Sequence, residues 1–105
     1  MAFGAAAIAL NRRREENRVP LPDPINTVEE QWCAFFYQIR NAFAHDIAEP
    51  KWHIKRPRFA RSYEISAHSK ADLTDLNGTS FEWSHVGGPA VIVPLKYFGK
   101  EHGII

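Results

Sequence analysis

Residues 26–48 read NTVEEQWCAFFYQIRNAFAHDIA and carry the clearest secondary-structure signal in the chain. Thr27 followed by Glu30 has the spacing of a capping box, in which each side chain bonds the backbone N–H of the other residue. Pro50 cannot continue a helix. Between these limits, apolar residues recur at intervals of three and four, as on one face of a helix: Val28, Trp32, Phe35, Phe36, Ile39 and Phe43. The pattern predicts a helix from Val28 to about Ile47, with its aromatic side chains in the core.

The residues before this helix, 1–25, divide into another helix-forming segment and a linker. Residues 5–17 are rich in Ala, Leu, Arg and Glu, which favour helices. Pro20, Pro22 and Pro24 then favour an extended linker, because proline restricts both its own backbone and that of the preceding residue.

The residues after the helix change to the patterns of β structure. Side chains alternate along residues 59–67 as they do in a strand, and Asn77-Gly78 is typical of a hairpin turn. We therefore expect a β region over residues 59–84. In the C-terminal segment, 89–105, residues 90–98 remain open between a strand and a helix that Pro89 would begin. The predicted fold class is α+β, with a small antiparallel hairpin or sheet after one long helix.

The composition is that of an ordinary globular domain. The chain has 105 residues, of which 45% are hydrophobic and 24% charged, and one domain over residues 1–105 is expected. The net charge of +1 gives no overall electrostatic argument for binding to nucleic acid. The five histidines do not have the spacing of a metal site, and no P-loop or dinucleotide fingerprint occurs. We expect neither a metal nor a cofactor.

The N-terminal sequence and the cysteine content indicate the cellular compartment to expect for this protein. The apolar run at residues 2–10 precedes the basic run at 12–14, which reverses the order of a secretory signal. No apolar run approaches the roughly 18–20 residues of a membrane span, so no membrane partner is expected. Cys33 is the single cysteine, which excludes an internal disulfide and suits a reducing compartment. We expect a cytoplasmic protein.

Positive charge is concentrated in residues 51–70, which carry six cations and one anion. Aromatic residues and His53 are interleaved with these cations, as on a surface that follows phosphates and stacks bases. The alternative is a solvated face without a ligand. The cations predicted to contact an RNA backbone are Lys55, Arg56, Arg58 and Arg61.

The hexapeptide Arg40-Asn41-Ala42-Phe43-Ala44-His45 ends the predicted helix. Its pattern of Arg, a polar residue, three residues and His resembles the signature of HEPN domains. That family includes metal-independent ribonucleases of toxin–antitoxin, CRISPR-associated and abortive-infection systems, and members that only bind or scaffold. The resemblance implies a helical core around the motif helix and a homodimer in which both motifs line one cleft. It also implies an antitoxin or another protein as a partner.

The resemblance assigns catalytic roles to three residues. His45 is the general acid or base, Arg40 binds the scissile phosphate, and Asn41 orients His45 or the phosphate. Helical spacing puts Tyr37, Asn41 and His45 on one face. Arg40 and His45 lie about 140° apart around an ideal helix. Either the end of the helix is distorted, or a partner chain supplies the missing group.

The predicted function is therefore a metal-independent endoribonuclease or RNA-binding module of the HEPN type. The alternative is a non-catalytic HEPN-like domain for interaction or dimerisation.

Overall fold

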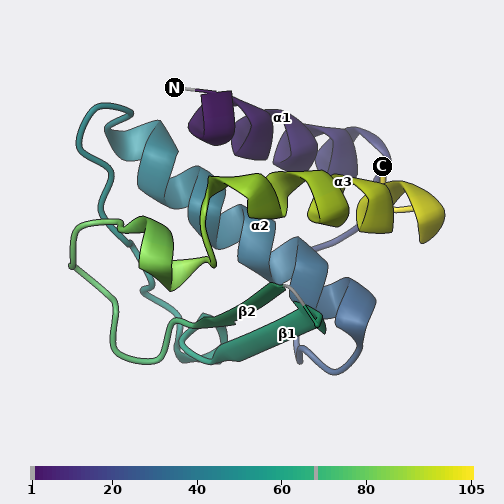
Figure 1. Ribbon diagram of the computed structural model, residues 1–105. Helices are drawn as coiled ribbons and strands as arrows, with labels where there is room; N and C mark the ends of the chain where they lie inside the picture. Colours follow the sequence, from purple (N-terminus) through teal and green to yellow (C-terminus); the bar gives the residue numbers. More distant parts are fainter. Residues whose placement is uncertain (1, 68) are drawn as a thin grey trace.

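The computed structural model describes residues 2–67 and 69–105. In chain order this part forms helix α1 (Ala2–Glu16), helix α2 (Val28–His45), strands β1 (Ser62–Ser66) and β2 (Ser69–Asp72), and helix α3 (Ile92–Glu101). The two strands pair antiparallel. Figure 1 shows α1 and α3 on one side of α2 and the sheet on the other. The predicted α+β class is confirmed.

Helix α2 begins as the sequence predicts and ends slightly earlier. Thr27 Oγ1 accepts a hydrogen bond from the Glu30 N–H at 3.1 Å, and Glu30 Oε1 accepts one from the Thr27 N–H at 2.8 Å. This is the expected capping box. The helix ends at His45 because Asp46 is extended and its Oδ1 accepts hydrogen bonds from the N–H groups of Ala48 and Glu49. The chain thus turns before it reaches Ile47.

The core surrounds α2 on several sides. Its buried residues include the expected aromatics and also residues on other faces: Trp32, Cys33, Ala34, Phe35, Phe36, Gln38, Ile39, Ala42 and Phe43. Phe3 of α1 packs on Phe43, and Tyr63 of β1 packs on Phe35. On the α3 side, Trp32 Nε1 donates a hydrogen bond to the Leu95 carbonyl at 2.8 Å.

The predicted hairpin at Asn77-Gly78 is wrong. The antiparallel strands are β1 and β2, so the connection between them lies near residue 67. Residues 77–81 pair instead with an earlier segment: the Trp52 N–H donates to the Thr79 carbonyl, and the Phe81 N–H donates to the Pro50 carbonyl, each at 2.9 Å. The Asn77 side chain serves this pairing, because its Oδ1 accepts the Ile54 N–H at 2.9 Å. A long-range contact therefore overrides the local turn signal.

The C-terminal segment, which the sequence left open, is helical. A short 3-10 turn, Pro89–Val91, leads into α3. Pro94 is the third residue of α3, where a helix offers no partner for a backbone N–H, so its missing donor costs nothing. Within residues 2–67 and 69–105, no helix combines the length and apolar character needed to cross a membrane.

Gly99 tests the close approach of α3 to α2. A Cβ at this position would lie 2.7 Å from Cζ2 of Trp32, which is fully buried. Alanine is better than glycine in an open helix by about 1 kcal/mol, but overpacking costs about 1–3 kcal/mol. We expect Gly99→Ala to lower the free energy of unfolding by up to about 2 kcal/mol in urea denaturation, the overpacking cost less the helix-propensity gain. The exposed control Glu101→Ala should change it by less than about 0.5 kcal/mol, and a stabilising Gly99→Ala would contradict the packing.

Candidate functional site

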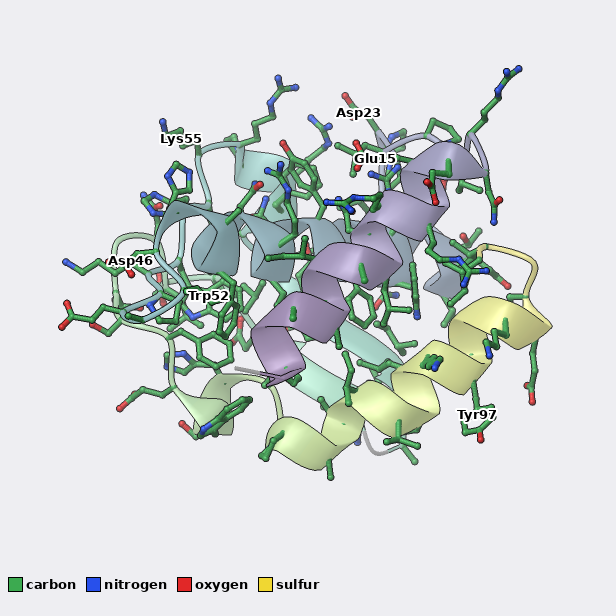
Figure 2. All side chains as sticks on the ribbon, turned by 90° about the horizontal axis from the view of Figure 1, so that it is seen from above. Glu15, Asp23, Asp46, Trp52, Lys55 and Tyr97 are labelled. Atoms are coloured by element: carbon green, nitrogen blue, oxygen red, sulfur yellow. The ribbon has the colours of Figure 1, made fainter. Side chains whose placement is uncertain are left out.

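A pocket of about 250 Å³ opens at the C-terminal end of α2, and we call it the histidine pocket. Lys55 and Asp46 are both labelled on the left side of the molecule in Figure 2, the side of this end of α2. One wall comes from α2 and the other from residues 53–59. The lining residues are Tyr37, Gln38, Asn41, His45, His53, Lys55, Arg56 and Phe59.

The α2 wall follows from helical spacing. Tyr37, Asn41 and His45 were predicted to share a face, and all three line the pocket. The opposite wall depends on an alternating segment. Trp52 and Ile54 are buried, so His53 between them is turned outward and is half-buried at the pocket.

The imidazole rings of His45 and His53 are in contact, with centroids 4.0 Å apart and planes inclined at 34°. Burial is the main cause that lowers the pKa of His53 below its ordinary value, followed by the charges of His45, Lys55 and Lys51. Histidine has an ordinary pKa of about 6.5, so His53 is neutral at pH 7 and can accept a proton. His45 is the last residue of α2.

The remaining charge in the pocket is positive. Lys55 and Arg56 are exposed, and neither forms an ion pair within the described residues. No carboxylate of those residues lines the pocket. Two imidazoles, an ammonium and a guanidinium make a site suited to an anion such as a phosphate.

Arg40, predicted to bind the scissile phosphate, does not line the pocket of its own chain. Its side chain is exposed, and its Nη1 donates a hydrogen bond to Asn41 Oδ1 at 3.1 Å. Helix α2 is α-helical as far as His45, so a distorted last turn does not bring Arg40 towards His45. Of the three predicted catalytic residues, the structure brings Asn41 and His45 together in the pocket.

Arg58 and Arg61, two of the four predicted RNA-binding residues, hold the proline-rich linker. Arg58 Nε donates a hydrogen bond to the Pro22 carbonyl at 3.0 Å, and Arg61 Nη1 donates one to the Ile25 carbonyl at 2.9 Å. Arg58 also pairs with Asp23 at 3.6 Å. The structure thus divides the basic strip into Lys55 and Arg56 at the pocket and Arg58 and Arg61 at the linker.

Sequence reasoning placed Tyr37 on the face of Asn41 and His45, and His53 within the basic strip, but assigned neither residue to the site. It did not identify Gln38 and Phe59 as pocket residues. For His53 a signal exists, since it lies between two large apolar residues within the basic strip. The other histidine of the basic strip, His68, lies outside the described residues. For Gln38, the helical pattern does not predict that this buried polar residue lines the pocket.

A metal site or a reactive thiol requires a particular arrangement of His, Cys, Asp and Glu side chains. Among the described residues, no group of three His, Cys, Asp or Glu side chains is placed to hold a metal ion. Cys33 is buried, and burial raises the pKa of its thiol to about 11, so it remains an unreactive thiol at neutral pH.

No family model matches this chain, and no curated protein or solved structure matches it either. Its function must therefore be inferred from the residues of the histidine pocket.

Gln38 provides a test of whether the pocket is shaped for a ligand. Its Oε1 is buried and has no hydrogen-bond donor within the described residues, and such an unsatisfied group costs about 1–3 kcal/mol. We expect Gln38→Met to raise the free energy of unfolding by about 1 kcal/mol in urea denaturation, because it removes that cost at similar length.

The matched control is Gln31→Met on the same helix. Gln31 Oε1 accepts the Glu64 N–H at 2.8 Å, so this variant should lose about 1 kcal/mol instead. Equal losses in both variants would show that Gln38 is an ordinary, satisfied core amide.

Proposed function

We propose that this protein is a metal-independent endoribonuclease whose active site is the histidine pocket. The observation that carries the proposal is the contact between His45 and His53, whose rings are 4.0 Å apart in a pocket lined by Lys55 and Arg56. Two imidazoles side by side can act as a general base and a general acid near neutral pH, and His53, whose pKa is lowered, is the base.

The reaction begins with His53, whose lowered pKa keeps it neutral and able to accept a proton. It takes the proton of a ribose 2′-hydroxyl, and that oxygen forms a bond to the adjacent phosphorus. The bond between phosphorus and the 5′ oxygen breaks, and His45, as the general acid, donates a proton to the leaving oxygen. The products are a 2′,3′-cyclic phosphate and a 5′-hydroxyl, and the two imidazoles regain their starting states by proton exchange with water.

RNA is the substrate class because it carries its own nucleophile. An acid–base pair alone activates an internal 2′-hydroxyl, which DNA lacks. Lys55 and Arg56 neutralise the charge that grows on the phosphate oxygens. The half-buried ring of Tyr37, which packs on the buried Phe59 with ring centroids 5.5 Å apart, offers an aromatic surface for a base beside the phosphate.

The resemblance of Arg40-Asn41-Ala42-Phe43-Ala44-His45 to the HEPN signature supports the same reaction class. Because Arg40 is outside the pocket of its own chain, the proposal includes a homodimer in which Arg40 of one copy reaches the pocket of the other. A toxin–antitoxin or defence setting, with a protein that restrains the nuclease, belongs to the same proposal.

The position of Arg40 also favours a second candidate function. With its guanidinium exposed and bonded to Asn41, the chain would lack one catalytic group and act as a non-catalytic HEPN-like interaction domain. The two candidates differ in whether RNA is cleaved.

Cleavage of labelled single-stranded RNA in EDTA separates them. We expect the wild type to form cyclic-phosphate ends, and His45→Ala and His53→Ala each to lose at least about 100-fold in rate, the usual contribution of a general acid or base. The rate should fall at low pH, below about 6.5, where His53 becomes protonated and can no longer accept a proton. His102→Ala, which removes an exposed histidine outside the pocket, should retain the wild-type rate.

Mixing inactive variants tests the homodimer. Arg40→Ala and His45→Ala should each be inactive alone, and their mixture should regain part of the activity, because one site of each mixed dimer keeps both groups. No cleavage by the wild type at any pH would reject the nuclease and favour the interaction domain.

Lys55 and Arg56, at the pocket, should contribute to RNA binding, whereas Arg58 and Arg61, at the linker, should contribute to stability. We expect Lys55→Ala and Arg56→Ala each to weaken binding of a single-stranded RNA and to reduce the slope of log affinity against log salt by about 0.7 for each phosphate that is no longer neutralised. Arg58→Ala and Arg61→Ala should instead lower the free energy of unfolding, since they release carbonyls of the linker. Fluorescence anisotropy and urea denaturation of the same four variants measure both effects. A salt slope reduced by Arg58→Ala or Arg61→Ala but not by Lys55→Ala would contradict the assignment.

A further inference from the structure

A second hollow lies between α1 and α3, and we call it the α1–α3 groove. It has a volume of about 460 Å³. One wall is a stripe of α1 with helical spacing, Ala6, Ala9, Leu10 and Arg13, and the other is Ile92, Val93, Lys96, Tyr97 and Lys100 of α3. Val93 is 55% exposed and Tyr97 is 61% exposed, so two large apolar side chains of this groove face solvent.

The charges around this groove all have one sign. Arg13, Lys96 and Lys100 line it together with the apolar residues, and no carboxylate of the described residues does so. None of the three cations forms an ion pair within the described part of the chain. A complementary surface would therefore carry carboxylates beside apolar side chains.

The groove is also polarised along its length. Helices α1 and α3 run in the same direction in Figure 1, so Ala6 and Ile92 lie near one end and Arg13 and Lys100 near the other. The first end is apolar and the second is cationic. An α-helix with apolar residues on one face and carboxylates beside them matches this arrangement. Amphipathic helices bind to other proteins in the same way, with the apolar face in a hydrophobic groove.

We propose that the α1–α3 groove binds an acidic amphipathic helix of a partner protein. A second copy of this chain is a poor occupant, because pairing the groove with itself brings Arg13, Lys96 and Lys100 against the same cations. The partner's apolar residues contact Val93 and Tyr97, and its carboxylates contact the cations. Figure 2 shows Tyr97 and Lys55 at opposite sides of the molecule, so a helix bound here leaves the histidine pocket open.

The experiment uses a labelled synthetic peptide of about 15 residues, with Leu at positions i, i+3, i+4 and i+7 and Glu on both sides of that stripe. Binding to the full chain is followed by fluorescence anisotropy. We expect saturable binding to the wild type and at least a tenfold loss for Tyr97→Ser. Lys96→Glu/Lys100→Glu should lose at least tenfold and should gain affinity for a peptide with Lys in place of Glu.

Two controls keep the result specific. Lys51→Glu/Lys70→Glu reverses as many charges outside the groove and should bind the acidic peptide within about twofold of the wild type. A peptide of the same composition, scrambled to remove the apolar stripe, should bind at least tenfold more weakly. If both charge-reversal variants lost the same affinity for the acidic peptide, the loss would be due to net charge alone, and the proposal would be overturned.

Sedimentation of the chain without peptide tests the other occupant. If Tyr97→Ser converted a wild-type dimer into a monomer, the groove would be an interface between copies, and the proposal would be overturned. A wild-type mass that Tyr97→Ser leaves unchanged, together with peptide binding, supports an acidic partner. Because none of these measurements uses RNA, they stand apart from the proposed nuclease activity.

Discussion

Helix α2 has to be covered on nearly every side, and the other elements are arranged to do this. Its nine buried residues point in several directions, so one neighbouring layer could not shield them all from water. Helices α1 and α3 cover one side and the β1–β2 sheet covers another (Figure 1). The stripe of Tyr37, Asn41 and His45 is left uncovered enough to line a pocket. The site thus lies at the C-terminal end of α2, where the covering of the helix is incomplete.

The parts that could be predicted from the sequence are those determined by nearby residues. The capping box needs only Thr27 and Glu30, three positions apart, and the shared face of Asn41 and His45 needs only the helical period. The start of α2, its aromatic core and one wall of the pocket followed from such spacing. Helix α3 is one of the two alternatives that the sequence allows for residues 90–98. Pro89 suits the start of a helix, whereas the β-branched residues after it suit a strand equally well.

The parts that could not be predicted depend on contacts between distant residues. Asn77-Gly78 has the local chemistry of a hairpin turn, but the Asn77 side chain bonds the Ile54 backbone, so the strands pair elsewhere. In the same way, Arg56 and Arg58 carry the same charge and are separated by a single residue in the sequence. Arg56 lines the pocket, whereas Arg58 donates a hydrogen bond to the Pro22 carbonyl, and no local sequence pattern predicts where that carbonyl lies.

The pairing of residues 50–54 with residues 77–81 has a consequence for when the site comes into existence. The α2 wall, with His45, is held by local helix contacts, whereas the segment that carries His53 is held by the Thr79 carbonyl and the Asn77 side chain. During synthesis the chain emerges from its N-terminus, so His45 and His53 are both made before residues 77–81 are available to position the second ring. The contact between the His45 and His53 rings is therefore completed only after residues 77–81 have emerged, when about three quarters of the chain has been made.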